Sequence, residues 1–129
     1  MLRYIEKENK KLGFKYKDYY LPQGDSFSLT ATEQGGEDGV DVISRIVFKL
    51  GLNETACKIN PIFEQDYEKD VHGVWVLRVS GTDTAEWKPT CACDDEPYVY
   101  EIEAYFVDGE PVTLTSGHFT IEPQIGGGV

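Results

Sequence analysis

Two cysteines in an acidic stretch are the residues whose types and spacing come closest to chemistry. Cys91 and Cys93 are separated by one residue and precede three consecutive acids at 94–96. Zinc sites combine two cysteine pairs, or one pair with histidines, but here no second pair follows, and Cys57 and His72 are distant possible further ligands. A redox pair would have two intervening residues at a helix start. The spacing favours incidental thiols, with a metal or a surface or intersubunit disulfide as alternatives, so we predict no cofactor and no metal.

The remaining titratable residues predict no catalytic centre. His72 and His118 are the only histidines, and neither has a serine or cysteine nucleophile in a recognisable motif beside it. Glu101 and Glu103 have the residue types of a glycosidase couple, but we expect both to point outward into solvent. Acidic clusters at 37–38, 66–70 and 94–96 offer the oxygen ligands of calcium without matching a calcium-loop pattern. We therefore expect no catalytic residues and a protein that is not an enzyme.

The element best defined by the sequence is a hairpin over 98–121. Apolar residues occupy every even position from Tyr98 to Phe106, with Glu101 and Glu103 between them. This period of two is typical of a strand with one buried and one wet face. Asp108-Gly109 tolerates the positive φ angles of a tight turn, and a second strand follows from 112 to 121, interrupted at 115–117.

Similar patterns predict strands over 26–32, 43–50, 55–59 and 73–80, whereas 33–39 and 62–70 are expected to be loops. A helical turn over 81–87 is expected, capped by Thr82 or Asp83, with Trp87 folded under the body of strands as a plug. About seven short strands without a long helix predict an all-β fold, an antiparallel β-sandwich over 24–125. Its core should contain Phe27, Phe48, Trp75, Tyr98, Tyr100, Ile102, Phe106 and Phe119. The stretch 1–23 is expected to be an extended N-terminal arm and 126–129 a flexible tail.

Charge is distributed unevenly along the 129 residues. The net charge of −11 divides into +4 on residues 1–17 and −15 on the remainder. A body this acidic would be repelled by DNA, so we expect no nucleic-acid partner. The basic start contains no apolar run long enough for a secretory signal or a membrane span, so we expect no membrane association and synthesis in the cytoplasm.

The arm is the candidate partner-binding segment. It combines its positive charge with eight large apolar side chains, which are many for a tail that stays in water. We expect the arm to dock on another subunit, with a solvated, frayed terminus as the alternative. The residues expected to bind the partner are Tyr4, Ile5, Leu12, Phe14, Tyr16, Tyr19, Tyr20 and Leu21.

The order of motifs resembles small immunoglobulin-like structural proteins of tailed bacteriophages and prophages. The resemblance covers about residues 24–122 and rests on GDSFSL at 24–29, VWVLRVS at 74–80, TDTAEW at 82–87, YVYEIE at 98–103, and DG at 108–109 before VTLTSGHFTI at 112–121. It implies an immunoglobulin-like sandwich in the virion, made in the host cytoplasm: a head decoration, head fibre attachment, or tail or baseplate adaptor. It also implies other virion proteins as partners, and a homo-oligomer or repeated copies. The arm and the Cys91-Ala92-Cys93 loop fall outside the pattern.

A second function remains open from the residues. An immunoglobulin-like domain could instead bind a carbohydrate or a host surface group through exposed aromatics, for which Tyr67, Trp87 and Tyr105 are the candidates. A concave face lined by these rings would favour binding over assembly.

Overall fold

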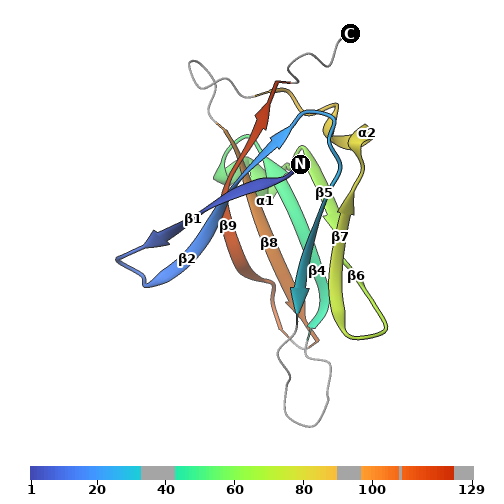
Figure 1. The fold of residues 1–129 in the computed structure, drawn as a ribbon. Coiled ribbons are helices and arrows are strands. Elements are labelled where there is room, and N and C mark those ends of the chain that lie inside the picture. Colours follow the sequence, from blue (N-terminus) through green and yellow to red (C-terminus); the bar gives the residue numbers. More distant parts are fainter. Residues whose placement is uncertain (33–42, 90–96, 108, 124–129) are drawn as a thin grey trace.

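The computed structural model describes residues 1–32, 43–89, 97–107 and 109–123. The described chain is mostly strand and forms two sheets that pack face to face (Figure 1). The predicted all-β sandwich is therefore confirmed. The loop expected at 33–39, the Cys91-Ala92-Cys93 loop and the tail at 126–129 lie outside the described residues.

The larger sheet has six strands in the order β1-β2-β9-β8-β4-β5. Their bounds are β1 Arg3–Asn9, β2 Phe14–Pro22, β9 Val112–Glu122, β8 Tyr98–Phe106, β4 Ile43–Gly51 and β5 Phe63–Asp66. The smaller sheet has three strands in the order β3-β7-β6, with bounds β3 Phe27–Thr32, β7 Val74–Val79 and β6 Glu68–Lys69. All neighbouring strands are antiparallel except β2 and β9, which are parallel.

The predicted hairpin is the centre of the larger sheet. β8 pairs with β9 on one side and with β4 on the other, and the even-numbered side chains from Tyr98 to Ala104 are buried, while Phe106 is half-buried. β9 is continuous instead of broken at 115–117, and a register shift opposite Ile102 and Glu103 accommodates the extra residue Leu114.

An aromatic cluster fills the space between the sheets. Phe27 from the smaller sheet lies 6.1 Å from Phe48 and 5.4 Å from Phe119, ring centroid to ring centroid. Trp87 lies 5.0 Å from Phe63 and is buried, as the expected plug. Most side chains predicted for the core are buried there, whereas Phe106 is only half-buried; the buried ones are Phe27, Phe48, Trp75, Tyr98, Tyr100, Ile102 and Phe119.

The prediction that residues 1–23 form a separate, extended arm is wrong. β1 and β2 form a hairpin, and Tyr19 to Pro22 of β2 pair with Phe119 to Glu122 of β9. Tyr19 and Leu21 are buried in the core, so the sandwich does not begin at residue 24. Burying these apolar groups against the body offsets the entropy of ordering the segment.

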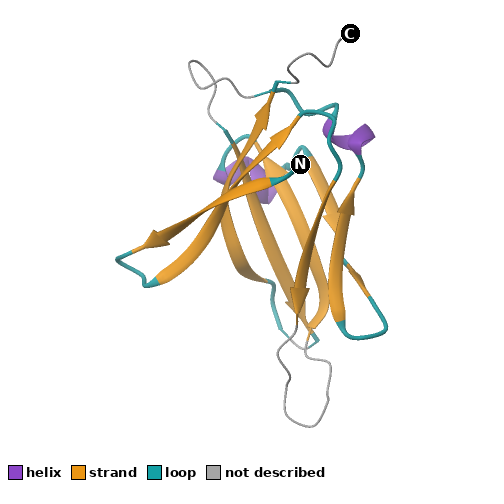
Figure 2. Cartoon of the chain, viewed as in Figure 1, coloured by secondary structure: helices purple, strands orange, loops and turns teal. Residues whose placement is uncertain are grey.

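Three local predictions also differ from the structure (Figure 2). The strand expected at 55–59 is the helix α1 (Glu54–Ile59), whose N-cap Asn53 accepts a hydrogen bond from the Ala56 N–H at 2.8 Å. The loop expected at 62–70 contains β5 and β6. The helical turn α2 (Gly81–Thr84) is present, but its N-cap is Ser80, not Thr82 or Asp83.

Candidate docking surface

The hairpin of β1 and β2 projects beyond the sheet that it joins (Figure 1). Its two strands pair along their whole length, from Arg3 opposite Tyr20 to Asn9 opposite Phe14, whereas β2 pairs with β9 only from Tyr19 onward. Among the residues described, the half of the hairpin nearer its turn therefore pairs with no strand of the body, although Gly117 of β9 lies against the backbone of Lys17.

Local hydrogen bonds build the turn at the hairpin's tip. The Asn9 side-chain oxygen accepts from the backbone N–H of Lys11 at 3.2 Å and of Leu12 at 3.1 Å. Gly13 has a φ of 73°, in the left-handed region that favours glycine, and its N–H donates to the Asn9 carbonyl at 2.8 Å. These local hydrogen bonds give the tip a defined shape.

The structure divides the eight predicted partner-binding residues into three groups. Tyr4, Ile5, Leu12 and Phe14 are exposed, with Leu12 at the tip retaining 72% of its accessible surface. Tyr16 and Tyr20 are half-buried. Tyr19 and Leu21 are buried in the core, so they are unavailable to a partner and the prediction is corrected for them.

Ionic contacts hold the hairpin weakly along its length. Lys7 Nζ lies 3.5 Å from Asp18 Oδ2, and Lys15 Nζ lies 3.6 Å from Glu6 Oε1. Lys17 Nζ lies 4.4 Å from the centre of the Tyr4 ring. The Lys15–Glu6 pair is exposed, and exposed ion pairs contribute roughly 0–1 kcal/mol each, whereas Asp18 of the other pair is buried. Near its tip, the hairpin therefore depends mainly on strand pairing.

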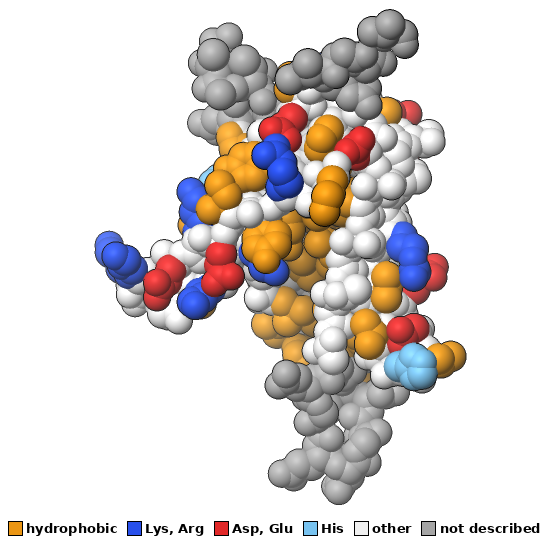
Figure 3. Space-filling model, in the orientation of Figure 1, with side chains coloured by type: hydrophobic (Ala, Val, Ile, Leu, Met, Phe, Trp, Pro, Cys, Tyr) orange, Lys and Arg blue, Asp and Glu red, His pale blue; other side chains and the backbone are white. Residues whose placement is uncertain are grey.

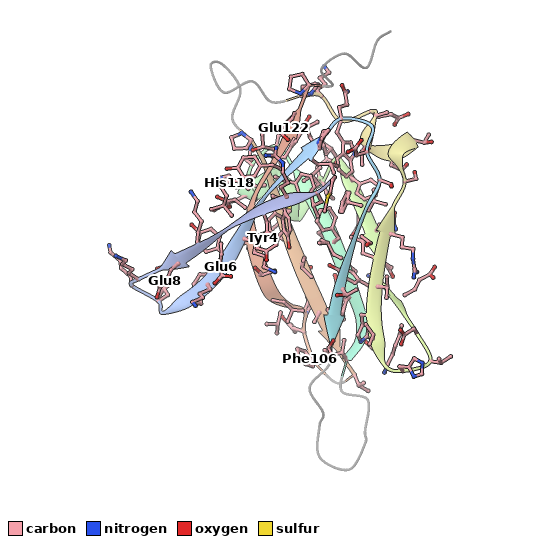
Figure 4. All side chains as sticks on the ribbon, in the orientation of Figure 1. Tyr4, Glu6, Glu8, Phe106, His118 and Glu122 are labelled. Carbon is pink, nitrogen blue, oxygen red and sulfur yellow. The ribbon has the colours of Figure 1, made fainter. Side chains whose placement is uncertain are left out.

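A groove lies between the hairpin and β3; β3 is the teal strand at the front of Figure 1. Its first part, of about 280 Å³, is bordered by Lys15 and Lys17 of β2, Leu29 to Ala31 of β3, and side chains of the core. Its second part, of about 470 Å³, continues along β3 from Ser26 to Thr30 under Met1 and Tyr4. Hydrophobic side chains gather in this hollow (Figure 3). The side chains of Tyr4 and Glu6 lie below β1 in the view of Figure 4.

The two glutamates expected in solvent are buried instead. Glu101 and Glu103 keep only 4% and 9% of their accessible surface, on the face of β8 opposite the core. Lys58 Nζ from α1 lies 3.8 Å from Glu101 Oε1, and Lys49 Nζ lies 3.3 Å from Glu103 Oε2. The other oxygen of Glu101, Oε2, is buried without a hydrogen-bond partner among the described residues. Burial raises the pKa of Glu101, the Lys58 charge opposes this rise and the Glu103 charge adds to it.

The described thiol and histidines form no reactive group. Burial raises the pKa of Cys57 to about 12, so the thiolate that attacks or binds metals is absent near neutral pH. His72 and His118 are exposed, and His118 Nδ1 lies 3.7 Å from Asp18 Oδ1. In the described part of the chain, no three His, Cys, Asp or Glu residues are grouped to hold a metal ion.

The aromatics considered for carbohydrate binding do not form an exposed face. Tyr67 and Trp87 are buried, and Tyr105 is half-buried beside Arg45, whose guanidinium carbon lies 5.1 Å from the ring centre.

The groove beside β3 was not predicted from the sequence. One feature of the sequence could have indicated it, because β3 contains no charged residue.

Neither a protein-family model, nor a curated protein, nor a solved structure matches this chain. Among the described residues, no helix is both long and apolar enough to span a membrane.

Proposed function

We propose that the protein is a structural component of a bacteriophage virion, an immunoglobulin-like assembly module that docks on other virion subunits through its projecting hairpin. The observation that carries the proposal is the hairpin tip, where Leu12 and Phe14 are exposed beside Lys10 and Lys11. Exposed apolar groups of this size on a protruding element are typical of a surface covered in an assembly.

Strand order supports the immunoglobulin-like part of the proposal. In variable-type immunoglobulin domains, strands G, F, C and C′ are neighbours in one sheet, and B, E and D in the other. Read in chain order, β3 to β9 take the letters B, C, C′, D, E, F and G, which gives the same neighbours. β2 then lies beside strand G.

A corner tyrosine supports it further. Tyr98 stands at the start of β8, in the place of strand F, and its hydroxyl donates to the Lys88 carbonyl at 3.1 Å. In immunoglobulin domains such a tyrosine stands two residues before the cysteine that bridges the sheets. Tyr100 occupies that cysteine's place here, and its ring stacks on Phe48 of the neighbouring strand β4 in the same sheet, with 6.1 Å between the ring centroids.

Charge supports docking on acidic partner surfaces, including further copies of the same protein. Residues 1–17 carry a net charge of +4 and the remainder −15. A basic hairpin on one subunit and an acidic body on the next attract each other, which speeds the encounter and orients it.

The test is incorporation of hairpin variants into particles produced by the genome that encodes the protein. We expect the double variant Leu12→Ser and Phe14→Ser to keep its melting temperature and to be at least tenfold depleted from purified particles, as quantified by mass spectrometry. The matched control is Ile59→Ser with Val71→Ser, which removes two exposed apolar groups outside the hairpin. Absence of the wild-type protein from particles would exclude the virion role, and equal incorporation of both variants would exclude the hairpin as the anchor.

A further inference from the structure

The outer strand β3 differs from the other sheet edges of the described structure. The edge strands β1, β5 and β6 each contain at least one charged side chain, whereas β3 reads FSLTAT and contains no charge and no proline. β3 pairs without a bulge along its whole length with β7, from Phe27 opposite Val79 to Thr32 opposite Val74. On its other side it has no strand partner among the described residues. Proteins usually protect such edges with charge, proline or bulges, so an unprotected edge indicates pairing with another strand.

The groove beside this edge is about as long as one added strand. Its two parts meet at Lys17, Tyr19, Leu29 and Thr30, and together they follow β3 from Ser26 to Ala31. Six residues of an extended chain span about 20 Å, the length of β3 itself. A strand that pairs with β3 would fill the space between β3 and the hairpin.

The walls of the groove favour apolar side chains at alternate positions of such a strand. Leu29 and Ala31 are only partly buried, and they pack against the core cluster at the place where the groove opens to it. The core side chains bordering the opening are Tyr19, Tyr67, Tyr100 and Ile102. Since alternate residues of a strand point to the same side, every second side chain of an added strand would enter this opening.

The charged side chains that border the groove favour an occupant of negative charge. Lys15 and Lys17 are the only residues with charged side chains that border it in the described structure. Glu6 partly compensates Lys15, but Lys17 contacts the Tyr4 ring and forms no ion pair with any described residue. A second copy that pairs through its own β3 is disfavoured as the occupant, because β3 contains no carboxylate that could reach Lys15 or Lys17.

We propose that β3 accepts an extended segment of a partner protein, with apolar side chains at alternate positions and a carboxylate that reaches Lys15 or Lys17. Backbone hydrogen bonds to the free edge would supply affinity, and the apolar opening and the two lysines would supply selectivity. This surface lies beside the hairpin, not at its tip, so the inference does not depend on docking of Leu12 and Phe14.

The test uses three blocked seven-residue peptides at physiological salt: alternating valine and glutamate, alternating valine and lysine, and the valine–glutamate peptide N-methylated at alternate residues. Binding is followed by amide NMR titration of the full chain. We expect the valine–glutamate peptide to shift the amides of 27–32 and to bind at least tenfold more tightly than the other two. Equal binding of the acidic and basic peptides, or unmoved amides on β3, would overturn the proposal.

Charge-reversed variants locate the selectivity. We expect Lys15→Glu with Lys17→Glu to weaken the valine–glutamate peptide at least tenfold, and Lys15→Glu alone, at the more exposed site, to weaken it severalfold. The control Lys10→Glu with Lys11→Glu makes the same charge change at the hairpin tip and should alter binding less than twofold. A comparable loss in the control would overturn the assignment to the groove. Sedimentation of the free protein tests whether a second copy of the chain occupies the β3 edge instead. A dimer that dissociates when β3 is substituted would show this and would overturn the proposal.

Discussion

Leu21 of β2 lies opposite Ile121 of β9 in a parallel pair, and both side chains are fully buried. Two residues 100 positions apart in the sequence thus join the start of the chain to its last described strand. The second half of the N-terminal segment therefore completes the core, while its hairpin tip carries the exposed Leu12 and Phe14 that we propose for docking.

The first prediction concerns this pair. Leu21→Ala should lower the free energy of unfolding by about 2–5 kcal/mol, because it opens a cavity in a packed core. Leu12→Ala removes the same atoms from a side chain that is 72% exposed, so its effect should stay within about 0.5 kcal/mol. Urea denaturation of both variants measures the difference.

Truncation tests the same relationship more severely. Removal of residues 1–21 strips Tyr19 and Leu21 from the core and exposes the edge of β9, so we expect loss of the cooperative unfolding transition. A truncated protein that melts within a few degrees of the wild type would mean that the segment is an independent arm after all.

The second prediction concerns the buried carboxyl of Glu101. Its pKa in the folded protein is raised above the ordinary value of 4.5, so folding is favoured by protonation of this group. Its contribution to stability is fully present below pH 4.5 and is lost as the pH rises through the raised folded pKa. Glu101→Gln keeps the shape without the charge, and should raise the melting temperature at pH 7 by on the order of a few degrees.

The pH dependence of the melting temperature shows whether the ionised carboxylate of Glu101 is the cause of this difference. The advantage of Glu101→Gln over the wild type should shrink as the pH falls from 7 toward 4. Glu86→Gln, on an exposed residue, controls for the loss of one negative charge. If Glu101→Gln is less stable than the wild type at every pH, the contact with Lys58 outweighs the cost of burying the carboxylate.

The third prediction concerns the close packing of α1 against β4. A Cβ atom at Gly51 would lie 2.5 Å from both Cα and N of Cys57, and these helix backbone atoms cannot move aside as a flexible side chain could. We expect Gly51→Ala to displace α1 and to cost about 1–3 kcal/mol. The control Gly109→Ala places its Cβ 3.8 Å from the Phe106 Cβ, an ordinary contact.

Thiol labelling reports the displacement directly. In a background with Cys91→Ser and Cys93→Ser, Cys57 should resist a thiol reagent at pH 8, because burial raises its pKa to about 12. Gly51→Ala should make it reactive under native conditions. Unchanged protection together with unchanged stability would show that the helix tolerates the methyl group.

The sequence by itself determined the strands whose side chains alternate, because the period of two is a local property of an extended chain. It placed β8, β7 and β3 and the aromatic core, since one face of each strand is apolar. The helix α1 was readable in principle from the cap Asn53 followed by Glu54, but six residues are too few for periodicity to distinguish a helix from a strand.

Only the tertiary structure decided where the first strands go and which polar groups are buried. Nothing within the segment containing Leu21 indicates that β9 leaves an edge open beside it, because pairing between distant strands depends on both partners. Glu101 alternates with apolar residues as a solvated residue would, yet Lys58 and Cys57 of α1 lie against it. Whether a side chain is buried depends on which distant segment packs against its strand, and the residue pattern of that strand alone does not specify this segment.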